Sequence, residues 1–151
     1  MTKTRVLVGL AMLAGVAVSA TGIAVGQDVI AQRKALMKEV GGATKTSSEM
    51  VKGEKPYDAK AAEGAMSTIA KHWITFAKLF PDNAKSGGET TAAAKIWEDP
   101  KGFEERGAKM VKDAEAAATA AGNGAEAFKA SFSEVAKNCK GCHEGYRVPK
   151  K

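Results

Sequence analysis

Residues 139–143 read Cys-Lys-Gly-Cys-His, and they hold both cysteines and one of the two histidines of the chain. On a helix, side chains three and four residues apart lie on one face, so Cys139, Cys142 and His143 would point the same way. Two thiols can then bond to the vinyl groups of one haem while the imidazole reaches its iron. The spacing therefore predicts a covalent site for one haem c per chain, with His143 as an axial ligand of the iron.

Two other kinds of site also use a Cys-x-x-Cys pair. A redox-active dithiol normally follows a strand in a βαβ unit, and no strand pattern is readable in this chain. A zinc site needs two further ligands, for which only His72 and carboxylates remain. We therefore favour haem over a dithiol and over zinc.

The N-terminus carries the pattern of a secretory signal. Lys3 and Arg5 precede an uncharged, apolar stretch over residues 6–26 that is rich in glycine and alanine, and charged residues follow directly. A positive start, an apolar middle and small residues at the end are typical of an export signal. We predict a signal peptide over residues 1–26 and a mature domain over residues 27–151, exported to the periplasm.

Small residues suit signal cleavage at two positions, after Ala20 and after Gly26. We favour Gly26, because Asp28 would then cap the first helix of the mature chain. The competing interpretation is an uncleaved membrane anchor, since twenty-one uncharged residues are long enough to span a bilayer. With the signal cleaved, no stable membrane insertion is expected.

Composition narrows the class of partner. Removal of residues 1–26 takes away two positive charges, so the formal charge falls from +6 to +4 over the remaining 125 residues, a length typical of one domain. The lysines alternate with glutamates rather than forming a basic stripe, which argues against nucleic-acid binding. The mild positive charge suits docking to an acidic redox partner. The lysines near the haem motif are Lys137, Lys140, Lys150 and Lys151.

Apolar residues spaced three and four apart predict four helices in the mature chain and no strand. The first helix is expected to run from Asp28 to about Val51, and the second to lie between Asp58 and Pro81. The third is expected to begin at Pro100 and to end before the turn at residues 122–124, and the fourth to follow that turn and end at the haem motif. Asp58 and Asp99 are expected to cap the second and third helices, and Pro81 to end the second. The predicted fold is all-α, an antiparallel up-and-down four-helix bundle with a covalently attached haem between facing helices.

The haem motif has companions elsewhere in the chain. Tyr146 and Arg147 follow it directly, residues 51–59 read VKGEKPYDA, and Lys95-Ile96-Trp97 precedes Phe103. With a Cys-x-x-Cys-His at the C-terminus of a four-helix chain, these stretches resemble the class II cytochromes c, or cytochrome c-prime family, over the whole mature domain. The resemblance implies a haem protein with redox partner proteins in the periplasm. If both axial positions of its iron are filled, no site is open for a substrate, and the protein is not expected to be an enzyme. Members of the family often form dimers, so a homodimer is one of the oligomeric states that the sequence leaves undecided.

The family has two branches that differ on the distal side of the iron. In the cytochromes c-prime no protein ligand binds there, whereas in the low-spin branch, the cytochrome c-556 type, a methionine of the first helix does. Residues 33–38 align with this part of the family and place Met37 at the iron. Met37 also shares an apolar stripe with Ile30 and Val40, and a thioether is a suitable haem ligand.

The sequence therefore favours a one-electron carrier with low-spin haem ligated by His143 and Met37. The alternative is a five-coordinate cytochrome c-prime that binds nitric oxide or carbon monoxide. A third interpretation is a weak Met37 bond that such a gas displaces. Met37 could also be plain core filler, and Met50, Met66, Met110 and His72 are less favoured candidates for the same position.

Two arginines have expected roles near the haem. Arg33 lies one helical turn before Met37, so its guanidinium could reach a haem propionate or else face solvent. Arg147 matches an arginine that the resemblance places near the proximal histidine, where it would tune the imidazole of His143 and limit solvent access.

Overall fold

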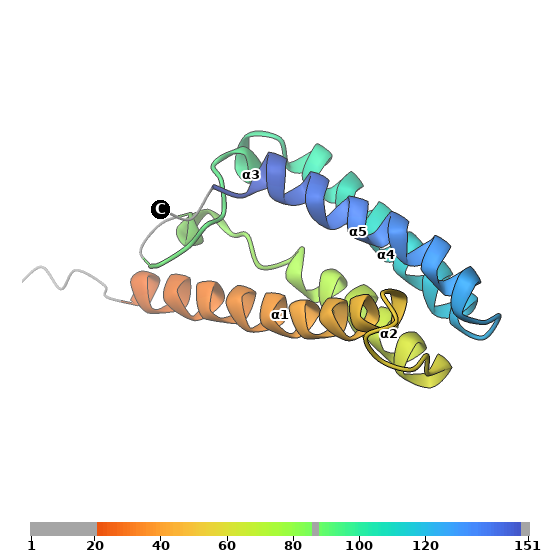
Figure 1. The fold of residues 1–151 in the computed structure, drawn as a ribbon. Helices are drawn as coiled ribbons and strands as arrows, with labels where there is room; N and C mark the ends of the chain where they lie inside the picture. Colours follow the sequence, from red (N-terminus) through yellow and green to blue (C-terminus); the bar gives the residue numbers. More distant parts are fainter. Residues whose placement is uncertain (1–20, 86–87, 149–151) are drawn as a thin grey trace, which may run out of the picture.

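The computed structural model describes residues 21–85 and 88–148, so residues 1–20 of the predicted signal peptide lie outside the described residues. Four long helices alternate in direction along the chain (Figure 1), which confirms the predicted all-α bundle. Two short helices in the long connection were not predicted. The elements in chain order are α1 Thr21–Val51, α2 Ala59–Phe76, the 3-10 helix η1 Asp82–Ala84, α3 Lys95–Glu98, α4 Pro100–Ala121 and α5 Ala125–Tyr146.

The predicted caps of α2 and α4 are confirmed. An Asp58 carboxylate oxygen accepts the backbone N–H of Ala61 at 3.0 Å, and Asp99 accepts that of Gly102 at 3.0 Å. Each carboxylate satisfies one of the backbone donors that a helix leaves unpaired at its start. Between α4 and α5 the chain turns at Gly124, whose φ of 100° lies in the left-handed region that favours glycine.

Two predicted helix boundaries differ from the structure. In the uncut chain helix α1 begins at Thr21, so Asp28 lies inside the helix there, and a cap at Asp28 in a chain cut after Gly26 stays a prediction. The small and apolar residues before Asp28 can continue a helix, and the continuous backbone ladder removes the need for a cap there. Helix α2 ends at Phe76, because the N–H groups of Lys78 and Leu79 bond to carbonyls three residues back, at 3.2 and 3.0 Å. This tighter turn carries the chain out of the helix before Pro81 is reached.

The core differs between the two ends of the bundle. We call the end with the 52–58 connection and the 122–124 turn the turn end; it lies at the right of Figure 1. From there to the middle of the bundle, four large apolar side chains are less than 2 % exposed, and the Tyr57 hydroxyl at this end donates to the carbonyl of Ala121 at 2.6 Å. The fully enclosed apolar side chains are Met66, Ile69, Phe128 and Val135.

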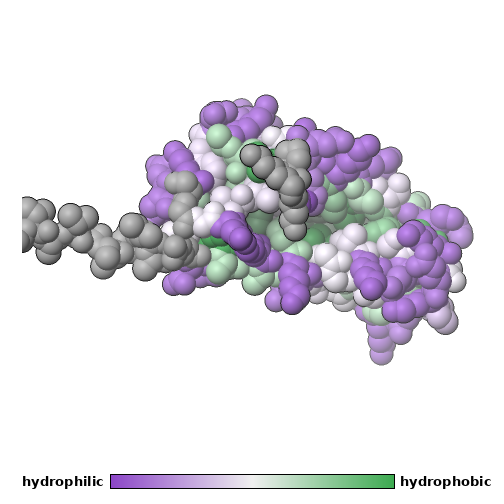
Figure 2. Space-filling view, turned by 60° about the vertical axis from the view of Figure 1, so that its left-hand side comes forward, coloured by the Kyte–Doolittle hydropathy of each residue, from purple (hydrophilic) through white to green (hydrophobic). Residues whose placement is uncertain are grey.

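The opposite end, which we call the aromatic end, holds the 77–99 connection and the last turns of α5. Successive aromatic rings contact one another there, with centroids 4.9–5.7 Å apart. Three of them stay half-buried, and Figure 2 shows apolar surface between hydrophilic rims on this side of the molecule. The six rings are Trp73, Phe76, Phe80, Trp97, Phe103 and Tyr146; the half-buried ones are Phe76, Phe80 and Trp97.

Among the helices of residues 21–148, none combines the length and hydropathy needed to cross a bilayer.

Candidate haem site

The predicted haem-binding residues lie on the last two turns of α5. Cys139 and Cys142 are free thiols, half-buried, and both pack against the hydrophobic core. Burial raises the pKa of both thiols, and for Cys142 the positive charge of Arg106 opposes the rise. Both thiols are neutral and pack against the apolar core, so an apolar macrocycle bound to them by thioether bonds would also contact this core.

His143 lies directly after Cys142 and is exposed. Its pKa is lowered, first because partial burial disfavours the imidazolium and then because of the nearby charge of Arg147. The neutral imidazole that results at pH 7 is the form that binds iron. Arg147 itself is exposed and extended, just beyond the end of α5.

Arg33, on the facing helix α1, is only 5 % exposed, so the interpretation of a solvated side chain was wrong. Its Nη2 donates to the carbonyl of Ala84 at 2.6 Å, and its guanidinium carbon lies 4.5 Å from the ring centroid of Phe80. Its Nε and Nη1 are buried without a partner, and burial lowers its pKa. A buried cation with two unpaired donors needs an anion with paired acceptors, which a carboxylate supplies.

Met37 lies one helical turn after Arg33, half-buried, and packs against the core. The three rival methionines, Met50, Met66 and Met110, are between 0 and 7 % exposed, so their sulfur atoms are enclosed by protein. His72 pairs with Glu39 across α1 and α2. Met37 is therefore the described methionine whose side chain remains partly open.

The end of α5 is fastened by contacts that the sequence did not predict. The Tyr146 hydroxyl donates to Asp99 at 2.9 Å, so the α4 cap also holds the residue three places after His143. The N–H of Ala93 donates to the carbonyl of Tyr146 at 3.0 Å, and a single bridge joins Ala92 to Arg147. These partners are 47 or more residues apart in sequence, so no local sequence pattern predicts the contacts.

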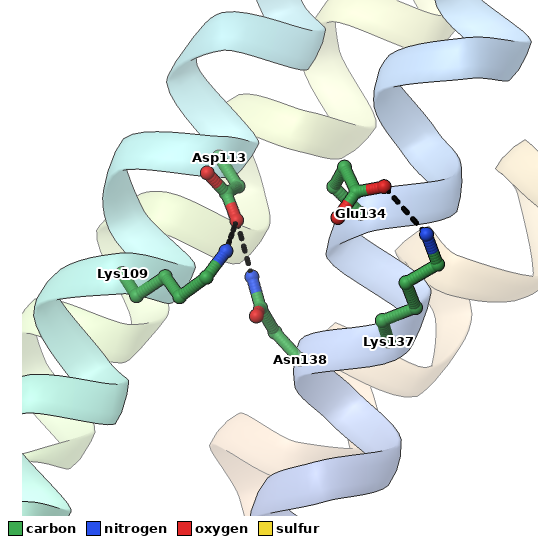
Figure 3. A network of polar contacts seen from close by, with 5 residues as sticks. All are labelled: Lys109, Asp113, Glu134, Lys137 and Asn138. Carbon is green, nitrogen blue, oxygen red and sulfur yellow. Dashed lines mark hydrogen bonds and ion pairs between the residues drawn. The ribbon is translucent and has the colours of Figure 1, made fainter.

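A polar network ties α5 to α4 just before the haem motif (Figure 3). One carboxylate oxygen of Asp113 accepts from Lys109 and from the amide of Asn138, the latter at 2.7 Å. These two hydrogen bonds lower the pKa of Asp113, the one from Lys109 contributing most. Because Asn138 immediately precedes Cys139, the network fixes the rotation of α5 at the first haem-linking residue.

The lysines near the motif are partly neutralised. Lys137 pairs with Glu134 at 2.7 Å, also drawn in Figure 3, and Lys140 pairs with Glu144 at 3.8 Å. Lys150 and Lys151 lie outside the described residues. The predicted positive docking surface is therefore weaker than a count of lysines suggests.

The residues present fit a covalently bound haem. They comprise two accessible thiols, a neutral imidazole, a half-buried thioether and a buried guanidinium with two unpaired donors. No group of three or more His, Cys, Asp or Glu side chains suited to a metal ion gathers within the described residues. The half-buried aromatic rings add the apolar surface that a macrocycle requires.

Comparison with known proteins identifies relatives along nearly the whole chain. The family profile described as Cytochrome C' matches residues 28–147. Cytochrome c' of Rhodopseudomonas palustris is 41 % identical, over 93 % of this chain and 97 % of the relative. Cytochrome c-556 of Agrobacterium tumefaciens is 37 % identical, over 78 % of this chain and 93 % of the relative. Both branch names therefore occur among the relatives.

The solved structures agree with this result. The cytochrome c' from Rhodopseudomonas palustris superposes with a TM-score of 0.78 at 40 % identity, over 82 % of this chain and 98 % of that chain. Cytochrome c' of Rhodopseudomonas palustris has a higher identity to this chain than cytochrome c-556 of Agrobacterium tumefaciens, which fits the cytochrome c' alternative better than the low-spin interpretation. The extent of these matches shows that the chain belongs to the cytochrome c' family, electron-transfer proteins with covalently attached haem c.

Proposed function

We propose that this protein is an exported one-electron carrier in which Cys139 and Cys142 hold the haem covalently and His143 and Met37 are its axial ligands. The observation that carries the proposal is the pairing of two facing surfaces. One is the Cys-Lys-Gly-Cys-His turn of α5, and the other is the α1 face on which Arg33 keeps two buried donors unpaired.

The haem, when bound, supplies an iron that gains and loses one electron. The chain determines how that group is held. The two cysteines fix its edge to α5, and His143 presents a neutral nitrogen, because its pKa is lowered. Arg33 would neutralise a propionate, since its Nε and Nη1 are buried without a partner and a carboxylate oxygen can accept their N–H groups.

Met37 supports the low-spin form of this proposal. It lies on the same face of α1 as Arg33, one turn further on, and it is half-buried against the core while its rivals are enclosed. With both axial positions filled, no site remains for a substrate, so enzymatic activity is not expected. The rigid bundle would keep the iron ligands in place in both oxidation states.

The second candidate is a five-coordinate protein that binds nitric oxide or carbon monoxide. The names of the relatives favour it, because cytochrome c' of Rhodopseudomonas palustris has a higher sequence identity to this chain than cytochrome c-556 of Agrobacterium tumefaciens and also superposes on it. In this form Met37 packs above the iron without binding it, as a methionine on an apolar face can do. The two candidates share every contact described above and differ in one sulfur–iron bond.

The absorption spectrum separates the candidates. We would record it for the purified haem protein in both oxidation states, with and without carbon monoxide, beside Met37→Leu and the control Met110→Leu. The low-spin form predicts a sulfur-to-iron charge-transfer band, no response to carbon monoxide, and loss of both properties only in M37L. A high-spin spectrum that responds to carbon monoxide equally in wild type and M37L would establish the second candidate instead.

Export and assembly complete the proposal. We infer that the signal is removed after Gly26, which makes Gln27 the first residue of a periplasmic protein with no stable membrane insertion. Its redox partners would carry an acidic docking surface. A homodimer would be its assembly, since members of the family often form dimers. An intact mass that corresponds to residues 27–151 plus one haem supports the processing step, whereas a mass that includes residues 1–26 contradicts it.

A further inference from the structure

We propose that Arg106 sets the redox equilibrium of the haem: its guanidinium lies against the turn between the two haem-linking cysteines and stabilises the reduced state. The inference rests on the proposed attachment at Cys139 and Cys142. It assigns a role to a residue on α4 that belongs neither to the haem motif nor to the facing helix α1.

The approach of Arg106 depends on a glycine. Gly141 stands between the two cysteines, and a Cβ added to it would lie 3.0 Å from Nη1 of Arg106. Such a distance is tighter than ordinary van der Waals contact, so the absent side chain makes room for the cation. The guanidinium therefore sits directly against the backbone that carries both thioether-forming residues.

Arg106 is held there from the other side by Tyr146. The guanidinium carbon lies 6.0 Å from the Tyr146 ring centroid, at the outer limit of a cation–π contact. The ring is itself fixed by the hydrogen bond from its hydroxyl to Asp99. The cation thus has a defined place between Gly141 and Tyr146, although its side chain is exposed.

The charge of Arg106 is less compensated than that of its neighbours. Lys109, Lys137 and Lys140 each pair with a carboxylate. Among the described residues, no carboxylate lies within ion-pair distance of Arg106. Asp99 is the acidic group that its charge reaches, and that carboxylate is already engaged by Gly102 and Tyr146. A net positive charge therefore remains beside Cys142.

The sign of the effect follows from electrostatics. Reduction adds one electron to the iron and lowers the positive charge of the haem, so a nearby fixed cation favours the reduced state. Water and salt screen an exposed charge. We therefore expect removal of the charge to shift the reduction equilibrium about threefold to tenfold toward the oxidised form, where tenfold corresponds to about 59 mV for one electron.

The test is a mediated redox titration of the haem-loaded protein, with electrons supplied by the electrode. Arg106→Gln should lower the midpoint potential. The midpoint potential of Arg106→Lys should lie closer to that of the wild type than to that of R106Q. The difference in midpoint potential between wild type and R106Q should shrink as salt is added. Lys101→Gln is the matched control, because Lys101 is an exposed cation on the same helix that pairs with Glu105. Its potential should equal that of the wild type.

Equal potentials in R106Q and wild type would overturn the inference. So would an R106K potential equal to that of R106Q with no dependence on salt, since that pattern indicates packing rather than charge. If R106Q does not load haem, Arg106→Met replaces it, because it removes the charge, keeps an unbranched side chain and should also lower the potential. A wild-type protein with no covalent haem would instead contradict the proposed function itself.

Discussion

The two ends of the four-helix bundle differ in how completely their side chains are packed. At the turn end the side chains complete the core by themselves: Phe128 and Met66 are fully enclosed, and Tyr57 bonds across to Ala121. At the aromatic end, Phe80 and Trp97 stay half-buried and Arg33 keeps two buried donors unpaired. The comparison teaches that the fully enclosed apolar side chains lie in one half, whereas several proposed haem-binding residues lie in the half whose packing is incomplete.

This division has a physical basis. A buried unpaired donor and half-buried apolar rings both destabilise the fold, and the binding of a ligand can offset this loss of free energy. The cysteines and the imidazole lie near the end of α5 in this half, and Met37 lies at the middle of α1. The largest expected effects therefore concern the covalent link, and the smallest concern polar contacts at the helix surface.

The largest effect is expected from Cys139→Ala combined with Cys142→Ala. Both thioether-forming sulfurs are then absent, so haem should be lost completely from the denatured protein. Haem staining of a denaturing gel measures this directly, with Ser133→Ala, an exposed change on the same helix, as the control. Stain that persists in the double variant would show that the haem is linked elsewhere.

A large effect on stability is expected from Phe128→Ala at the turn end. Phe128 is 0 % exposed, and removal of an enclosed ring costs about 3–5 kcal/mol in the free energy of unfolding. The visible spectrum of the haem should stay unchanged. Phe80→Ala should lower the free energy of unfolding less than Phe128→Ala does, as measured by urea unfolding. It should, however, alter the visible spectrum of the haem. Equal responses of the two variants would contradict the division between the ends.

A moderate effect is expected from Arg33→Met. The change removes a buried cation that we expect to bind a propionate, and lost hydrogen bonds to charged groups cost about 1.5–3 kcal/mol. Urea unfolding of the haem-loaded protein measures the loss. The control is Lys34→Met, because Lys34 is a surface residue paired with Glu89 at 3.6 Å. A stabilised R33M haem protein would count against the propionate contact, since it would mean that the buried charge only costs free energy.

The smallest effect concerns acid stability at the link between α4 and α5. Hydrogen bonds from Lys109 and then Asn138 lower the folded-state pKa of Asp113 below the unfolded value of about 3.9. The stabilisation is therefore present above that unfolded value and is lost as the pH falls through the folded-state pKa. We expect Asp113→Asn to reduce the loss of stability between about pH 5 and pH 3.

Urea unfolding at several pH values measures this slope, and Glu134→Gln is the control because Glu134 contacts Lys137 within its own helix. An unchanged slope in D113N would show that the contact with Asn138 contributes nothing to acid stability. It would also weaken the argument that this network fixes α5 beside Cys139.

Local patterns explain what the sequence could predict. The four helices, the caps at Asp58 and Asp99, and the grouping of Cys139 and His143 all depend on residues a few positions apart. The contacts that complete the site depend on residues far apart in the chain. Arg33 meets Ala84 across 51 positions, which no helical periodicity reports.

The same reasoning explains the errors. The start of α1 was misplaced for the uncut chain because Asp28 has a cap residue's chemistry in a position where the helix is already continuous. Arg106 was overlooked because its importance depends on the missing side chain of Gly141 on another helix. Where a side chain points on its own helix was predictable, whereas the group it meets required the assembled bundle.

The proton NMR spectrum of the reduced, haem-loaded protein tests the central claim most directly. A methionine bound to low-spin ferrous iron lies under the ring current of the haem, so its methyl group gives a three-proton resonance far upfield of other methyl signals. We predict that resonance in the wild type and in Met110→Leu, and its loss in Met37→Leu. A wild-type spectrum without it, broadened by high-spin iron, would contradict ligation by Met37 and leave the iron five-coordinate.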